Sequence, residues 1–477
     1  MSFKRALGPF DATMIVVGGI IGAGIFTNPY IVAQRLHTGP LVLAAWVAGG
    51  VIAMAGAFTF AELGSMFPKV GGHYAYLRDA YNPLAGFLYG WALLLMIETG
   101  AIAAVAIIFA EYTLRLVGRP DTYAVHLAIF AIILVTVVNY LGIKPGSRVL
   151  NVFVILKTAA LLVLIGAALL LPSADTTAVE GAQAPATAEE PAVADEPAAA
   201  ESLSAEAGAE SPTIPMVFVA FGAALIAVMF TYGGWQNANF VAEEIKNPRR
   251  NLPLSIVVGT AIVVAVYVSV NYVYLQALGR DGLASTMTPA ADASRYVMGA
   301  GGDTFITAAI AISTFGFLNL TVLAPTRVYY AMAADKVFFS SVARLHPRFR
   351  TPSLAIVIQS TWAILLVLTG TYAQLVGYVV FADQLFFALA GASLFVFRRT
   401  HPLKERPEGT FSTPGYPFVP ALFVAAATFI VLSALWSNPW GSGLGLVLLA
   451  TGVPAFFYWN RRRGGVSGSD QDSGSHE

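Results

Sequence analysis

The 477-residue chain is 57% hydrophobic and only 11% charged, whereas a soluble globular protein carries about 25% charged residues. Its formal net charge is zero, which gives no indication of a nucleic-acid partner. It has no cysteine, which excludes thiol catalysis, cysteine metal ligands and a disulfide-linked partner. The composition therefore predicts an integral membrane protein surrounded by the lipid bilayer.

Twelve apolar segments approach or exceed the roughly 20 residues that a membrane-spanning helix needs. In chain order they are residues 11–36, 40–66, 83–116, 124–142, 148–171, 214–240, 253–277, 303–333, 353–370, 374–397, 417–436 and 441–459. The sequence thus predicts an all-α integral membrane protein with 12 transmembrane helices in one domain, residues 1–460. No cleavage site follows the short basic N-terminus, so we interpret the first helix as uncleaved.

Lysine and arginine are unevenly distributed between the connecting segments. If the N-terminus lies inside, the cytoplasmic segments carry 20 of them and the outer segments five, while Lys157 and Arg327 lie within predicted helices. Positive residues are enriched on the cytoplasmic side of membrane proteins. We therefore expect a multi-pass protein of the cell (cytoplasmic) membrane with both termini in the cytoplasm.

Two further segments differ in composition from the helices. Residues 173–213 carry nine acidic residues and no lysine or arginine, and they are rich in alanine and proline. Such a segment cannot bury enough apolar surface to fold alone, so we predict an acidic disordered external loop that acts as a solvated linker. An acidic flap that attracts a ligand is the alternative. Residues 461–477 are predicted to form a disordered cytoplasmic tail.

Glycine clusters interrupt two of the predicted helices. One runs from Gly18 to Phe26 in the first helix, and the other runs from Phe230 to Asn237 in the sixth. Unwound backbone is tolerated in lipid only where it faces protein or a water-filled cavity, and paired interrupted helices indicate a transport site. We expect a five-plus-five inverted repeat with broken helices 1 and 6, covering about 11–171 and 214–397, plus two C-terminal helices at 417–459. Close helix packing is the alternative explanation of the glycines.

Helix breaks free backbone groups for ligand binding. The N-terminus of a half-helix presents N–H groups and a partial positive charge, which suits a carboxylate, while free carbonyls suit an ammonium group. A zwitterionic amino acid matches both, so we predict a substrate site with the following members. Gly22, Ala23, Gly24 and the adjoining Ile25 would meet the carboxylate, and Phe230, Thr231 and Gly233 would meet the amine. No catalytic set, metal-ligand spacing or phosphate-binding loop is present, so we expect neither an enzyme nor a cofactor.

Three blocks of sequence carry a resemblance to a known family. The run from Gly18 to Phe26 resembles the first-helix signature of the amino acid–polyamine–organocation (APC) transporters, and Ala61 to Tyr76 resembles the loop after their second helix. Phe230 to Pro253 is similar to helix six of the L-amino-acid transporter branch. The resemblance spans roughly residues 8 to 460, although the long acidic loop departs from the family pattern.

The resemblance implies roles for individual positions. Ile20, Ala23 and Gly24 would line the carboxylate site, and Phe230 would be an aromatic gate over bound substrate. Ala23 stands where many relatives carry serine, so a hydroxyl contact is missing. Gly233 lies near the point where relatives favouring cationic substrates can carry an acidic residue, which favours neutral side chains.

Three amides are further candidates for the substrate site. Gln236, Asn237 and Asn319 would be polar pocket residues, but the same side chains could serve as interhelical hydrogen-bonding groups.

Ionisable residues within membrane helices are treated as functional candidates. The resemblance implies that Lys157 replaces the sodium ion of sodium-coupled relatives of the fold, touching the unwound part of the first helix. It could also carry a coupling proton, or it could extend to the inner surface. Glu98 could accept a proton, pair with a cation or bind a substrate amine, and Asp383 is similarly placed. Glu62 lies nearer the cytoplasmic end and is interpreted as structural.

These features predict secondary active transport of neutral amino acids by alternating access. The transport would be either sodium-independent exchange or proton-coupled symport. Glu98 motivates one alternative, a proton-coupled transporter of cationic amino acids or polyamines. The other alternative is a membrane sensor or channel that uses the same site without turnover.

Overall fold

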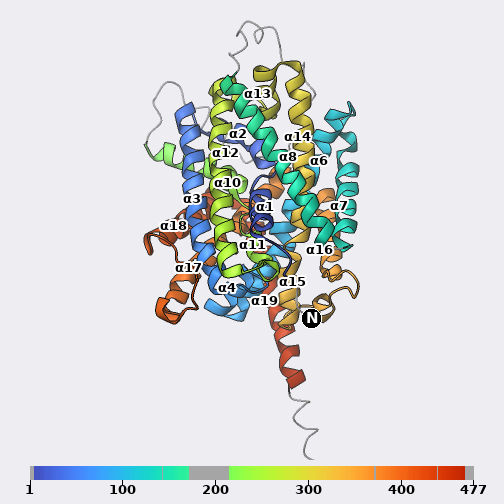
Figure 1. Cartoon of the computed structure of the whole chain (residues 1–477), viewed down its shortest axis with the longest axis vertical. Helices are drawn as coiled ribbons and strands as arrows, with labels where there is room; N and C mark the ends of the chain where they lie inside the picture. Colours follow the sequence, from blue (N-terminus) through green and yellow to red (C-terminus); the bar gives the residue numbers. More distant parts are fainter. Residues whose placement is uncertain (1–4, 142, 171–213, 370–371, 438, 468–477) are drawn as a thin grey trace, which may run out of the picture.

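The computed structural model describes residues 5–141, 143–170, 214–369, 372–437 and 439–467 (Figure 1). Apart from helices and connecting segments, these residues contain one isolated parallel bridge, between Leu7 and Ile245. Ten helices of the described residues are long and apolar enough to cross a membrane, and two shorter apolar helices cover Met216–Tyr232 and Ser353–Thr369. The predicted all-helical membrane class is therefore confirmed, and the external loop at 173–213 lies outside the described residues.

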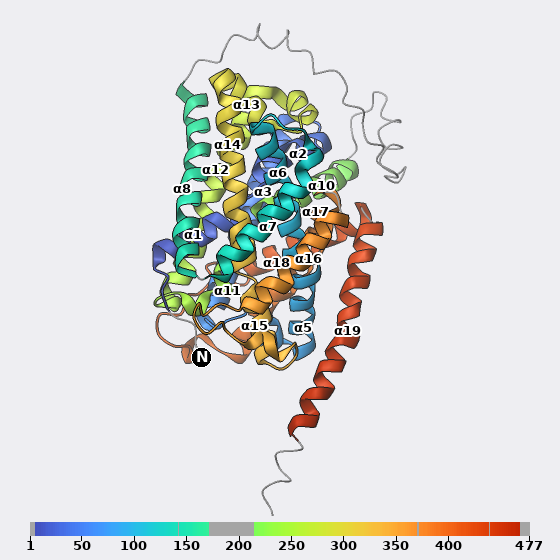
Figure 2. The same ribbon diagram turned by 90° about the vertical axis from the view of Figure 1, so that its right-hand side faces the viewer.

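The long helices run side by side along the long axis of the molecule (Figures 1 and 2). The first half contains α1 (Pro9–Ile20), α2 (Gly24–Arg35), α3 (Gly39–Met66), α5 (Pro83–Ala92), the π-helical turn η1 (Leu93–Ile97), α6 (Glu98–Leu116), α7 (Ala124–Tyr140) and α8 (Ile143–Leu170). The second half contains α10 (Ile214–Tyr232), α11 (Asn237–Phe240), α12 (Pro248–Ser285), α14 (Ala300–Leu323), α15 (Thr326–Ala334), α16 (Ser353–Thr369), α17 (Tyr372–Thr400), α18 (Phe418–Ser437) and α19 (Pro439–Ser467).

Short helices connect these elements. They are α4 (His73–Ala80), η2 (Asp121–Tyr123), η4 (Ala242–Glu244), α13 (Pro289–Met298), η5 (Ser340–Ala343) and η6 (Leu403–Glu405). Composition gave no signal for α4 and α13, because neither is long enough to span a membrane.

Every predicted apolar segment coincides with helix, but two boundaries differ from the prediction. The segment at 303–333 is divided into α14 and α15, because Pro325 has no N–H with which to continue the helical ladder. Helix α19 continues through Ser467, so the tail predicted to be disordered from residue 461 begins as helix. Arginine is a good helix former, and Arg461 to Arg463 continue the helix beyond the predicted span. The remainder of the tail lies outside the described residues.

Both predicted helix breaks are present, and they meet at the centre of the molecule. Helix α1 ends at Ile20 and α2 begins at Gly24, while α10 ends at Tyr232 and α11 begins at Asn237. Helix α2 packs against α10, and α1 packs against α11, α12 and α8. The two interrupted segments therefore form the core around which the other helices are arranged.

A pair of glycines brings the two breaks into backbone contact. A Cβ atom on Gly234 would lie 1.9 Å from the carbonyl oxygen of Gly19, and a Cβ atom on Gly19 would lie 2.5 Å from the carbonyl oxygen of Gly234. Gly234 also has φ +107°, which side chains rarely tolerate. Close packing thus explains Gly19 and Gly234, which belong to the same clusters as the glycines of the breaks.

We expect Gly234→Ala to destabilise the protein by about 3 kcal/mol, because the new methyl group clashes with backbone and favours a different φ. Thermal unfolding in detergent, followed by tryptophan fluorescence, measures the loss. The control is Gly166→Ala in α8, where a Cβ atom meets nothing within 4 Å. Equal melting temperatures for the two variants would contradict the glycine contact.

Glu62 joins α3 to the end of α17 and to the segment that follows it. Its carboxylate oxygens lie 2.7 Å from Arg398 Nη2 and 2.6 Å from Arg406 Nη1, and Thr413 donates its backbone N–H at 2.7 Å. The Glu62 side chain is completely buried. These bonds agree with the structural role expected from the sequence.

Replacing Glu62 by Gln leaves two buried guanidinium groups without their anion, so we expect a loss of about 3 kcal/mol of stability. Asp281→Asn is the matched control, because the Asp281 side chain in the ion pair with Arg280 is 91% exposed. Its melting temperature is expected to stay at the wild-type value. A Glu62→Gln variant as stable as the control would show that the buried pair contributes nothing.

Candidate functional site

At the first break, side chains from two other helices donate hydrogen bonds to carbonyls at the end of α1. Tyr267 of α12 donates its hydroxyl to the Ile20 carbonyl at 2.8 Å. The Lys157 ammonium of α8 donates to the Gly18 carbonyl at 2.9 Å and also to the Ile21 carbonyl. Three carbonyls at the negative end of the α1 dipole therefore already accept hydrogen bonds from side chains.

The start of α2 has the opposite character. Among the residues that the structure describes, the backbone N–H groups of Ala23, Gly24 and Ile25 donate to no acceptor. They lie at the positive end of the α2 dipole, where anions are stabilised. Unpaired N–H groups at a buried helix start require a partner, and a carboxylate fits this position.

The second break is fixed by its own side chain and backbone. The Gly234 N–H donates to Gln236 Oε1 at 2.8 Å, and the Gly233 N–H donates to the Phe230 carbonyl at 3.3 Å. Phe230 therefore lies in the last turn of α10 with its carbonyl in use, which differs from the prediction that this carbonyl faces an amine. The Thr231 and Gly233 carbonyls accept no hydrogen bond within the described part of the chain.

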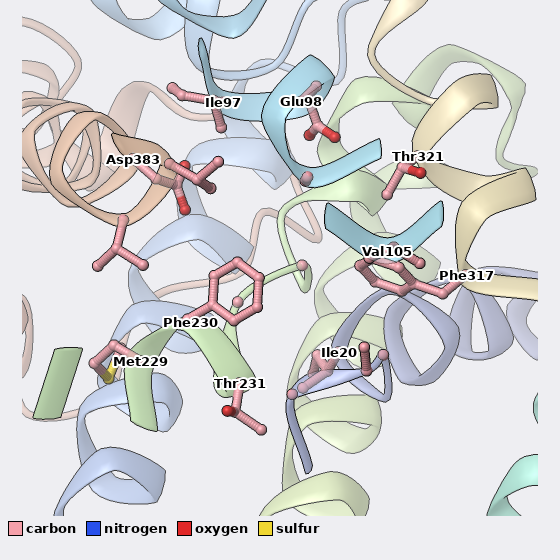
Figure 3. A pocket seen from close by; sticks show the side chains of 18 of the residues that line it. Ile20, Ile97, Glu98, Val105, Met229, Phe230, Thr231, Phe317, Thr321 and Asp383 are labelled. Carbon is pink, nitrogen blue, oxygen red and sulfur yellow. The ribbon is translucent and has the colours of Figure 1, made fainter. Parts of the chain in front are cut away.

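A cavity of about 60 Å³ lies between the two breaks and the neighbouring helices (Figure 3). One water occupies roughly 10–15 Å³ on this measure, so the space holds a few water-sized groups. It is lined by Ile20, Gly22, Ala23, Gly24, Ile97, Glu98, Ala101, Val105, Met229, Phe230, Thr231, Gly233, Gly234, Gln236, Asn237, Phe317, Thr321, Val379, Val380, Asp383 and Gln384.

Most of the predicted site residues meet in this cavity. The ring of Phe230 projects into its centre (Figure 3). Asn237 also lines it, and its buried Oδ1 has no hydrogen-bond partner in the structure. A buried amide oxygen without a partner is costly and is available to a donor from a ligand.

Three predicted residues lie elsewhere. Ile25 is buried behind the cavity wall. Asn319 is turned toward α7, where Asn139 Nδ2 donates to its Oδ1 at 2.9 Å, so its alternative interpretation as an interhelical hydrogen-bonding group applies. Lys157 is buried outside the lining and contacts the first break as expected, with Nζ 5.9 Å from the centre of the Phe317 ring.

Several lining residues were not part of the predicted substrate site. Phe317 and Thr321 come from α14, and Asp383 and Gln384 come from α17. Asp383 carried a signal, an ionisable side chain within an apolar segment, but the sequence did not show that it shares a cavity with Glu98. Within the described residues, no group of three or more His, Asp or Glu side chains gathers to hold a metal ion.

A bundle of apolar helices that encloses a small cavity between two broken helices defines a multi-pass membrane protein. A family model described as Amino acid permease matches residues 7–450. The chain belongs to the amino acid permease family, which confirms the resemblance to the APC transporters.

Individual relatives align over nearly the whole chain. The serine/threonine exchanger SteT of Bacillus subtilis (strain 168) is 29% identical over 96% of this chain and 98% of its own length. The large neutral amino acids transporter small subunit 2 of Mus musculus is 30% identical over 97% of this chain and 83% of its own length. The cystine/glutamate transporter of Homo sapiens is 28% identical, with 97% and 87% covered. By name, these relatives are transporters or exchangers of amino acids.

Proposed function

We propose that this protein is a secondary transporter that moves α-amino acids across the cell membrane by alternating access. The observation that supports this most directly is the pair of complementary helix breaks that face one cavity. Twelve spans in a five-plus-five inverted repeat, about 11–171 and 214–397, with two additional helices and both termini in the cytoplasm, complete the proposed architecture.

Substrate recognition follows from the backbone groups. The free N–H groups of Ala23 and Gly24 bind the carboxylate, and the Thr231 and Gly233 carbonyls bind the ammonium group. Asn237 Oδ1 supplies a further acceptor. Because both ends of the zwitterion are held by backbone, the site recognises the part that all amino acids share.

The outer half-helices are coupled to each other. Asn28 of α2 donates its Nδ2 to Thr231 Oγ1 at 2.9 Å and to the Ala227 carbonyl at 3.1 Å, both in α10. In the proposed cycle α2 and α10 move together, with Phe230 as the gate over bound substrate. Because of this coupling, the two half-helices can move as one rigid body during alternating access.

Lys157 makes the proposed transport independent of sodium. Its ammonium already donates to the Gly18 and Ile21 carbonyls at the break. The resemblance to the APC transporters implies that a sodium ion fills this place in sodium-coupled relatives of the fold. Since the charge is covalently attached, no dissolved cation is required there.

Counterflow in proteoliposomes without sodium tests the proposed function. Vesicles loaded with one amino acid are expected to accumulate a labelled amino acid against its gradient, because a carrier exchanges one substrate for another. The corresponding amine without its carboxylate is expected to fail, since the α2 N–H groups then lack their anion. A channel or a sensor that binds without turnover would show no trans-stimulation.

Replacing Lys157 by Met leaves two buried carbonyls without their donor, so we expect sodium-free counterflow to fall by about tenfold or more. The control is Lys246→Met, because Lys246 is exposed at the start of the segment that leads to α12. Undiminished sodium-free counterflow in the Lys157→Met variant would contradict the role of the tethered ammonium.

A further inference from the structure

Two carboxylates from different helices face the same cavity. Glu98 begins α6 and Asp383 lies in α17, and both line the space between the helix breaks. Glu98 is only 4% exposed. No lysine, arginine or histidine is among the lining residues of this cavity. The cavity therefore has a strongly acidic wall with no compensating base of its own.

The buried carboxylates elsewhere in the described part of the chain have cationic partners. Glu62 is held by Arg398 and Arg406, and Glu244 lies 3.1 Å from Arg327 Nε. Within the described residues, the carboxylates of Glu98 and Asp383 accept no hydrogen bond and form no ion pair. Glu98 is buried and Asp383 is partly buried, and an uncompensated charge in such a place is expensive. A positive charge from outside the protein would therefore stabilise this pair.

The other ionisable groups around the pair do not supply this charge. The charged group close enough to interact with Glu98 is Asp383. The phenols of Tyr89 in α5 and Tyr329 in α15 also lie within electrostatic range of Glu98. Helix α14 faces the cavity with Phe317 and Thr321, which carry no charge. The ammonium of Lys157 is directed at the carbonyls of the first break instead.

The backbone before Glu98 is specialised. Residues Leu93–Ile97 form a π-helical turn, and Thr99 donates its hydroxyl to the Leu94 carbonyl, five residues earlier, at 2.8 Å. Such turns occur mostly as single bulges at functional sites, because the extra residue alters which side chains face inward. Here the turn ends at Ile97 and is followed directly by Glu98, and both residues line the cavity.

Apolar side chains separate the acidic wall from the helix breaks. In Figure 3 the Phe230 ring lies between the carboxylates of Glu98 and Asp383 on one side and Ile20 and Thr231 of the breaks on the other. Val105, Val379 and Val380 add apolar surface to the lining. An aliphatic stem would be accommodated along this surface, with a charged end at the carboxylates.

We propose that Glu98 and Asp383 form a subsite for a positively charged side chain of the substrate, an ammonium or a guanidinium group. The substrate class is then the cationic amino acids, with the α-carboxylate and α-amine at the breaks and the second cation at the acidic pair. This assignment of the substrate class rests on the proposed function. This subsite favours the alternative that Glu98 motivated, a transporter of cationic substrates. The glycine at position 233 favoured neutral side chains, because relatives can carry their acidic residue near that position. Here the acidic groups come from α6 and α17 instead.

Matched pairs of amino acids test the subsite. Citrulline has the shape of arginine without its charge, and norleucine has nearly the shape of lysine without its ammonium group. Arginine and lysine are expected to inhibit counterflow of labelled arginine at concentrations at least about tenfold lower than citrulline and norleucine. In Glu98→Gln and Asp383→Asn that preference is expected to disappear. Glu111→Gln, a carboxylate of the same helix outside the lining, is the control and should keep it.

Ligand-induced thermal stabilisation in detergent separates the subsite from transport. Stabilisation by arginine but not citrulline, without counterflow, would support the subsite and reject the proposed function. Counterflow of neutral amino acids with no preference for arginine, in wild type and both variants, would overturn the subsite and keep the function. If neutral uptake instead depends on pH and the variants lose that dependence, the pair binds a proton, and the cationic-substrate assignment is wrong.

Discussion

The backbone contact between Gly19 and Gly234 is the constraint on which the rest of the structure depends. Two interrupted helices can place their free backbone groups in one small cavity only if their chains approach without side chains between them. The contact draws the end of α1 against the turn after α10. Lys157, Tyr267 and Gln236 then satisfy the groups that face away from the cavity, so that the remaining free groups are directed inward.

Local composition was sufficient to predict most of the architecture. Long apolar runs marked the helices, and the glycine clusters marked both breaks, because the free energy of a helix in lipid depends chiefly on its own residues. The boundary of the second break was less predictable. Thr231 donates its hydroxyl to the Ala227 carbonyl, and α10 continues as far as Tyr232. Phe230 therefore keeps its cavity position but belongs to the helix.

The tertiary partners of polar side chains could not be predicted in the same way. Asn319 was a reasonable pocket residue by its position along α14, but it faces Asn139 of α7. Glu98 and Asp383 are separated by most of the chain, and only the packing of α6 against α17 brings them to one cavity. Sequence showed that each was unusual within an apolar segment, whereas their joint effect depends on the fold.

The tethered ammonium of Lys157 has a consequence for the energetics of the proposed cycle. A dissolved ion that is bound on one side and released on the other adds the energy of its own gradient to each turnover. A charge attached to α8 returns with the protein and adds none, so accumulation must draw on the gradient of a second substrate, on a proton gradient or on the membrane potential. A substrate that carries one net positive charge gains about 2.3 kcal/mol for each 100 mV that it crosses toward the negative side of the membrane. The identity of the side chain therefore also decides whether the voltage across the membrane can drive uptake.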